Sequence, residues 1–323
     1  MSSRPSRSRT PSSVYPAARN SPPTRRRASP SMRSSSKKAF GTDPPPSPIL
    51  DPPRGACHPL WARDTTSPAR EGVMELKDKV AIVTGGGRHI GRAIAYRLNE
   101  LGCQVVVCAR TQKEIDHTAA VIQEQGGRSM AVHCDVSKLE DVERVIQATL
   151  KFFGRIDFLV NNAGNYVEGP LEDATLEDFE ASIASNLKGA FLFTRAVLPH
   201  LKQAESGRVV NVASLFGLVP SANLALYSMA KAGLIGFTKA LARELHPEGI
   251  NVNAVCPGSV TTDEDEVIEL EETRPVLGSR LIPRDVADVV CHLLTDHCSQ
   301  ITGAAIEVPG ATGLQVAAIA TRA

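Results

Sequence analysis

The sequence predicts one doubly wound α/β domain built on a parallel sheet, and three observations carry that prediction. Short apolar runs alternate with stretches of helical periodicity from Lys79 onward. The apolar runs are continuous, as in strands that helices cover on both faces. A glycine-rich turn at residues 85–87 joins the first apolar run to the first helical stretch. Strand, turn, helix and strand in this order form the unit of a parallel sheet.

The alternation continues to residue 308 without an internal repeat. Apolar runs rich in Val, Ile and Ala predict strands at residues 80–84, 105–108, 130–134, 158–161, 209–213, 252–256 and 305–308. Apolar residues that recur every three or four positions predict helices at residues 90–101, 113–125, 139–153, 176–201, 223–244 and 284–294. We therefore expect one domain within residues 74–323 and no second domain.

Residues 1–73 differ from the rest of the chain. The segment is rich in Ser, Pro and Arg, and no acidic residue occurs before Asp43. Such a segment cannot bury enough apolar surface to offset its conformational entropy, so we expect disorder. Three origins are open: an organellar transit peptide, a basic tail that touches anionic surfaces, or a start upstream of the natural one, which the position of Met74 favours.

Composition excludes several classes of partner. The formal net charge of the 323 residues is +1, which gives no reason to expect nucleic acid. The seven cysteines contain no CxxC pair, so we expect neither a disulfide framework nor a metal site. No apolar run reaches the roughly 18 residues of a membrane span. We expect a cytoplasmic protein, or an organellar one if residues 1–73 are a transit peptide.

Tyr227 and Lys231 lie one turn apart on a predicted helix face. A phenol with a pKa near ~10 is a poor acid at neutral pH, but a fixed ammonium stabilises its phenolate. Such a pair can exchange a proton with an alcohol or carbonyl oxygen. The pattern is compatible with acid–base chemistry at Tyr227, but a Tyr and a Lys at this spacing are on their own more often a chance pair on a helix surface.

The turn between the first strand and helix predicts a dinucleotide site. Glycines there let the backbone approach a pyrophosphate, which the helix N-terminus then stabilises. The candidate contacts are Gly85, Arg88, His89, Ile90 and Gly91. After the second strand the chain has Ala109-Arg110-Thr111, where an NAD-selective site places a carboxylate. Guanidinium groups match a phosphate, so Arg88 and Arg110 predict NADP(H) over NAD(H).

Five motifs in order resemble the classical short-chain dehydrogenase/reductase family: residues 84–91, Asn161-Asn162-Ala163-Gly164, Asn186, Ser214 and Tyr227-Ser228-Met229-Ala230-Lys231. The resemblance implies a Rossmann-like fold and an oxidoreductase that moves hydride between nicotinamide and a carbonyl or secondary alcohol. It implies that Tyr227 is the general acid or base and that Lys231 lowers its pKa and binds the nicotinamide ribose. Ser214 would hold the substrate oxygen, and Asn186 would support a relay water.

The resemblance also implies further cofactor contacts: Asp135, Val136, Asn162, Ala163, Gly164, Pro257, Gly258, Val260 and Thr262. Two positions depart from the family pattern. His89 stands where glycine is usual, so its side chain either crowds the phosphates or donates to them. Near the C-terminus, residues 308–311 read Val-Pro-Gly-Ala where Asp-Gly-Gly is usual.

The sequence gives weaker indications of the substrate and of the oligomeric state. Seven acidic residues between 263 and 272 would disfavour strongly anionic small acids. By resemblance, a 3-oxoacyl thioester is the default substrate, and sugar, steroid-like and aromatic ketones remain open. A homo-oligomer, dimer or tetramer, is also expected by resemblance, with residues 176–201 and 223–244 as faces. The alternative is a catalytically silent dinucleotide-binding or regulatory protein on the same fold.

Overall fold

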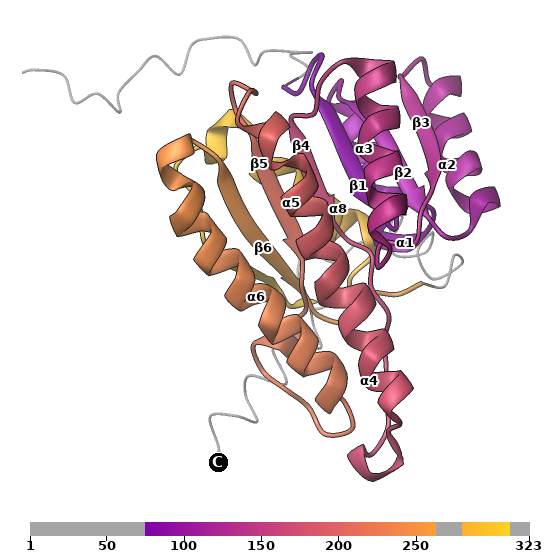
Figure 1. Ribbon diagram of the computed structural model, residues 1–323, viewed down its shortest axis with the longest axis vertical. Coiled ribbons are helices and arrows are strands. Elements are labelled where there is room, and N and C mark those ends of the chain that lie inside the picture. The colour runs from indigo at the N-terminus through magenta and orange to yellow at the C-terminus, as the bar shows by residue number, and fades with distance from the viewer. Residues whose placement is uncertain (1–74, 263–279, 311–323) are drawn as a thin grey trace, which may run out of the picture. The chain divides into compact units, whose positions relative to one another are not determined.

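The computed structural model describes residues 75–262 and 280–310, which form a parallel sheet between two layers of helices (Figure 1). The expected disordered extension and the acidic segment at residues 263–272 lie outside these residues. The described strands pair in the order β3-β2-β1-β4-β5-β6-β7, and every pairing is parallel. Their bounds are Val80–Thr84 (β1), Gln104–Ala109 (β2), Ser129–His133 (β3), Phe158–Asn161 (β4), Arg208–Val212 (β5), Asn251–Pro257 (β6) and Ala305–Val308 (β7). The predicted fold class is confirmed.

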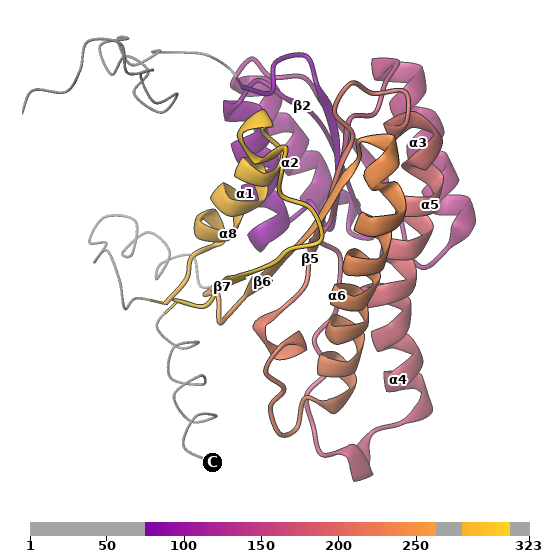
Figure 2. The same ribbon diagram turned by 90° about the vertical axis from the view of Figure 1, so that its left-hand side faces the viewer.

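The helices cover both faces of the sheet, as Figure 2 shows edge-on. One layer contains His89–Glu100 (α1), Gln112–Glu124 (α2) and Pro283–Leu293 (α8); the other contains Leu139–Phe153 (α3), Leu176–Ile183 (α4), Gly189–Leu201 (α5) and Ala225–Leu245 (α6). Along β1, Ala81 and Val83 pack into the first layer while Ile82 packs into the second. Because both faces of the strand are buried in apolar surroundings, its sequence is apolar without alternation.

One predicted helix differs from its expected form. Residues 176–201 are interrupted by a π-helical turn at Ala184–Lys188 between α4 and α5. A π turn inserts one extra residue per turn and rotates the side chains that follow it. Asn186 lies in this turn and is buried, with 1% of its surface exposed.

The described helices include none that is long and apolar enough to cross a membrane. The strand order reverses between β1 and β4, so the crevice for a ligand lies at the carboxyl ends of these two strands.

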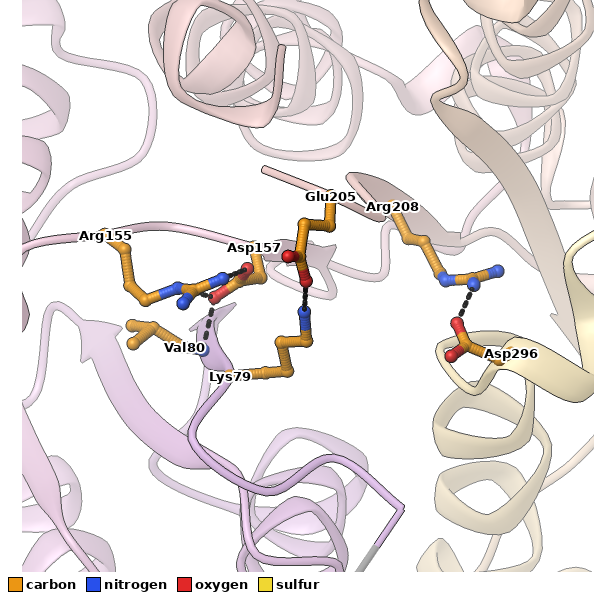
Figure 3. A network of polar contacts seen from close by, with 7 residues as sticks. All are labelled: Lys79, Val80, Arg155, Asp157, Glu205, Arg208 and Asp296. Carbon is orange, nitrogen blue, oxygen red and sulfur yellow. Dashed lines mark hydrogen bonds and ion pairs between the residues drawn. The ribbon is translucent and has the colours of Figure 1, made fainter. Parts of the chain in front are cut away.

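The amino edge of the sheet is held by charged groups (Figure 3). Asp157 is fully buried beside the start of β4, where one carboxylate oxygen accepts from the Val80 backbone N–H at 2.9 Å. The Arg155 guanidinium binds the same carboxylate through two hydrogen bonds, at 2.6 and 2.8 Å. Lys79 and Glu205 form a second pair 3.4 Å apart, with the Glu205 side chain 89% exposed. Asp157 thus joins the amino ends of two neighbouring strands.

Asp157→Ala is expected to lower the free energy of unfolding by about 3 kcal/mol, because it leaves a buried N–H and a guanidinium without their acceptor. Glu205→Ala is the matched control and should change it by less than ~1 kcal/mol, since its ion pair is exposed. Urea unfolding of the two variants measures the difference. Equal effects would show that Asp157 does not join the strands.

Candidate active site

Ser214 and Tyr227 meet at the carboxyl edge of the sheet. Ser214 follows β5 and is buried, and its Oγ accepts from the Phe216 backbone N–H at 3.1 Å. Tyr227 lies in the first turn of α6. Burial raises the pKa of Tyr227, while a hydrogen bond with the Ser214 side chain opposes that rise. The two hydroxyls are therefore placed to contact the same atom.

Lys231 is 4% exposed and lies below the Tyr227 ring. Its Nζ is 5.7 Å from the ring centroid and donates to the Val212 carbonyl oxygen at 2.9 Å. Burial lowers the pKa of Lys231 to about 8. Desolvation of the phenol raises the pKa of Tyr227, and the Lys231 ammonium donates to the Val212 carbonyl oxygen, so the lowering of the Tyr227 pKa by Lys231 stays a prediction.

Asn186 is oriented by the π turn. Its Nδ2 donates to the Asn165 carbonyl oxygen at 3.0 Å and to the Asn165 Oδ1 at 2.7 Å. Its Oδ1 is buried and has no hydrogen-bond partner among the residues that the structure describes. A Cβ on Gly164 would collide with this oxygen and would come within 3.4 Å of Lys231 Nζ. The Asn186 oxygen and the Lys231 ammonium therefore both border the space that the missing side chain of Gly164 leaves free.

The glycine turn is attached to the end of β4. Thr84 Oγ1 accepts from the Asn162 and Ala163 backbone N–H groups, each at 3.0 Å. Asn162 Nδ2 donates to the carbonyl oxygens of Thr84 and Gly85, at 2.9 and 3.2 Å. Gly85 has a φ of +65°, and a Cβ on Gly91 would collide with the Gly85 carbonyl oxygen. Both glycines are needed for this approach of backbone to backbone.

His89 is exposed and opens α1 with a φ of +45°. This left-handed conformation explains why glycine is usual here, since a side chain costs about 1–2 kcal/mol. Histidine is among the residues that tolerate it best. The adjacent Ile90 is half-buried against the core.

The charged candidate residues lie at the start of α1 and after β2. Arg88 and Arg110 are both exposed, beside α1 and after β2. Burial raises the pKa of Asp135, but hydrogen bonds from Ser137 and the charge of Arg110 outweigh burial and leave the pKa below its usual value. Val136 is buried against Gly189. Arg110 is thus close enough to Asp135 for its charge to act on the Asp135 carboxylate.

The segment after β6 is held by the C-terminal strand. Gly258 donates its N–H to the Val308 carbonyl oxygen at 2.9 Å, and Val260 pairs with Leu281. Pro257 is buried at the end of β6, and Thr262 is exposed at the last described position before the gap. A Cβ on Gly258 would collide with the Pro309 carbonyl oxygen. The unusual residues 308–310 therefore support the turn at residues 257–258.

Two site residues were missed in the sequence. Asn165 binds the Asn186 amide, and the Tyr166 ring packs edge-on against the Tyr227 ring. Asn165 and Tyr166 are the two residues after Gly164, and this position next to the Asn-Asn-Ala-Gly motif could have identified them. The described residues contain no group of three His, Cys, Asp or Glu side chains that could hold a metal ion.

The chain is similar to known oxidoreductases. The family model described as short chain dehydrogenase matches residues 79–273. The 3-oxoacyl-[acyl-carrier-protein] reductase of Synechocystis sp. is 40% identical over 242 residues, which cover 73% of this chain and 97% of the relative. Dehydrogenase/reductase SDR family member 4 of Homo sapiens is 37% identical over 248 residues, 73% of this chain and 88% of the relative.

A solved structure extends this similarity. The short chain dehydrogenase from Burkholderia cenocepacia, in complex with NADP, is 34% identical with a TM-score of 0.67. The match covers 73% of this chain and 98% of that one.

Gly91→Ala is expected to lower the free energy of unfolding by about 2–3 kcal/mol, because the new methyl must displace the Gly85 carbonyl. Gly236→Ala is the control: it lies in α6 with nothing within 4 Å of the added methyl, and should stabilise the protein by up to ~1 kcal/mol. Urea unfolding compares the two. A neutral Gly91→Ala would show that the turn has room to move.

Proposed function

Because the chain belongs to the short-chain dehydrogenase family of NAD(P)-dependent oxidoreductases, we propose that it transfers hydride between NADP(H) and a carbonyl or secondary alcohol, with Tyr227 as general acid or base. The observation that carries the proposal is the convergence of Ser214, Tyr227 and Lys231 beside the glycine turn. In this reading the residues 74–323 make one catalytic domain.

The residues of the glycine turn fit a dinucleotide. Gly85 and Gly91 leave the backbone bare where a pyrophosphate would approach the N-terminus of α1. Asn162, Ala163 and Gly164 would line the cofactor from β4, and Pro257, Gly258, Val260 and Thr262 would lie at the nicotinamide end. A bound nicotinamide supplies the hydride, and the protein supplies orientation and acid–base help.

The proton moves through Tyr227. The raised pKa of Tyr227 keeps its hydroxyl protonated at neutral pH, so it acts as a proton donor to a carbonyl oxygen in reduction. The Ser214 hydroxyl would hold that oxygen in place. In the reverse direction the same phenol accepts the proton of the alcohol through its phenolate.

Lys231 and Asn186 would resupply the proton. The buried Asn186 Oδ1 needs a donor, and the space beside Gly164 separates it from the Lys231 ammonium. A water molecule there would accept from Lys231 and donate to Asn186, which satisfies the buried oxygen. Lys231 would also bind the nicotinamide ribose.

Cofactor preference is assigned to Arg88 and Arg110. Both side chains are exposed, and the adjoining positions after β2 offer no carboxylate to a ribose hydroxyl. A 2′-phosphate would be bound between the two guanidinium groups, with the adenine near Asp135 and Val136. The NADP complex of the Burkholderia cenocepacia relative supports this preference.

Substrate and assembly complete the proposal. The relatives named 3-oxoacyl-[acyl-carrier-protein] reductase make a 3-oxoacyl thioester the first substrate to test. Exposed apolar side chains on the expected helix faces support a homo-oligomer: Leu176, Phe179, Phe191 and Met229. The six described cysteines are free thiols, which supports a reducing compartment such as the cytoplasm.

Tyr227→Phe is expected to lower turnover about 10²–10⁴-fold, because it removes the proton donor while keeping the ring. NADPH binding, followed by its fluorescence, should change by less than about threefold, since the phenol acts on the substrate. Tyr96→Phe is the matched control, because Tyr96 packs on the core from α1 and should leave turnover unchanged. Full activity of Tyr227→Phe, or no turnover in the parent enzyme, would favour the catalytically silent alternative.

Arg110→Ala is expected to reduce the ratio of kcat/KM for NADPH over NADH by about tenfold, as expected for the loss of one charge-assisted phosphate contact. Lys151→Ala removes an exposed cation at the far end of α3 and should leave the ratio unchanged. Initial rates with NADPH and with NADH measure this ratio of kcat/KM values. A parent enzyme that uses NADH as well as NADPH would contradict the assigned preference.

A further inference from the structure

The turn between β1 and α1 contains three consecutive glycines, Gly85, Gly86 and Gly87. Glycine populates more backbone conformations than any other residue, so a run of three loses the most conformational freedom when it is ordered. A turn that binds a ligand in one conformation therefore needs contacts from outside the turn to keep it in that conformation.

The first two glycines are held by the sheet. The N–H groups of Gly85 and Gly86 donate to the Cys108 carbonyl oxygen in β2, at 2.7 and 3.4 Å. A Cβ on Gly86 would come within 2.7 Å of Val107 Cγ1, so its bare backbone packs directly on the same strand. Cys108 and Val107 are fully buried. These two glycines are therefore fixed by a strand that cannot easily move.

The third glycine is held by the neighbouring helices. The Arg92 guanidinium in α1 donates twice to the Gly87 carbonyl oxygen, from Nε at 3.0 Å and from Nη2 at 2.7 Å. Thr118 Oγ1 in α2 lies farther from the same oxygen, at 3.4 Å. A Cβ on Gly87 would come within 2.8 Å of the Glu114 Cβ, so Gly87 also packs on α2. Since charge-assisted hydrogen bonds are the stronger ones, Arg92 is the main contact that fixes this carbonyl.

This contact decides which way the next peptide group faces. The Gly87 carbonyl and the Arg88 N–H belong to one planar trans peptide, so they point in opposite directions. Because the carbonyl faces Arg92, the Arg88 N–H faces away from Arg92. Arg88 is the N-cap residue of α1; its side chain does not cap the helix, and the described first turn contains no acidic residue. A reversed peptide would instead present a carbonyl oxygen to an anion at this helix start.

We propose that Arg92 is a positioning residue for the cofactor, which holds the glycine turn in the conformation that presents the Arg88 N–H to the pyrophosphate of a dinucleotide. The inference rests on the proposed function and deepens it by naming a residue that acts through the backbone of the turn. The 2′-phosphate is assigned to the side chains of Arg88 and Arg110, whereas the pyrophosphate is common to NADPH and NADH. Loss of Arg92 should therefore weaken both cofactors by the same factor.

The test titrates NADPH and NADH, followed by their fluorescence, into Arg92→Met and Arg92→Gln, two variants of equal side-chain length. Arg92→Met removes the donor and should raise the Kd of both cofactors about tenfold, the order of one lost charge-assisted hydrogen bond. Gln can place its amide nitrogen where the Arg92 Nε lies, 3.0 Å from the Gly87 oxygen, without a charge. Arg92→Gln should therefore stay within about threefold of the parent. In both variants kcat at saturating NADPH should change by less than about twofold.

Arg97→Met is the matched control, because Arg97 lies on the same helix but pairs with Glu100 and Asp288. It should change neither Kd by more than about twofold. Weaker binding of NADPH alone would show that Arg92 acts as a charge on the 2′-phosphate, and equal losses in the Met and Gln variants would show that it acts by charge on both cofactors; either result overturns the inference.

Two other results would also overturn the inference while leaving the proposed function intact. One is an unchanged Kd for both cofactors in Arg92→Met. The other is a fall in kcat as large as the rise in Kd, which would give Arg92 a structural role only. A parent protein that binds neither NADPH nor NADH would reject the proposed function, and the inference with it.

Discussion

A single threonine hydroxyl fixes the geometry on which the site depends. Thr84 ends β1, and its Oγ1 accepts two backbone N–H groups from the turn that follows β4. The strand order reverses between these two strands, so no other strand separates them. Because the glycine turn follows Thr84 and Gly164 follows Ala163, this junction brings the proposed pyrophosphate site next to the space between Asn186 and Lys231.

The fold could be predicted because strands that are buried on both faces appear in the sequence as continuous apolar runs. Ala81, Ile82 and Val83 point alternately into opposite layers, so the strand is apolar on both faces and the run is visible in the sequence. The site residues were visible for a related reason. Each stands at the carboxyl end of a strand or in the first turns of a helix, where parallel topology brings distant segments together.

Other features depend on contacts that no local pattern records. The π turn at Ala184–Lys188 occurs in a stretch whose apolar spacing fits an ordinary helix, so one extra residue leaves no signal. The pKa of Tyr227 is raised by the burial of its phenol and that of Lys231 is lowered by the burial of its ammonium, and the spacing of the two residues says nothing of desolvation. His89 was visible as a departure, but only its backbone angle gives the cause.

The buried Asp157 carboxylate and the proposed reaction lie at opposite ends of the same strands. At the amino ends, the Asp157 carboxylate accepts from the Arg155 guanidinium and from the Val80 backbone N–H, while at the carboxyl ends the Thr84 hydroxyl joins β1 to the turn after β4. The groups that stabilise the fold are therefore different from those that are proposed to carry out the reaction. Heat tolerance can be adjusted around Asp157 and Arg155, and substrate range at the carboxyl edge around Ser214, so that either property can diverge among descendants while the other is inherited unchanged.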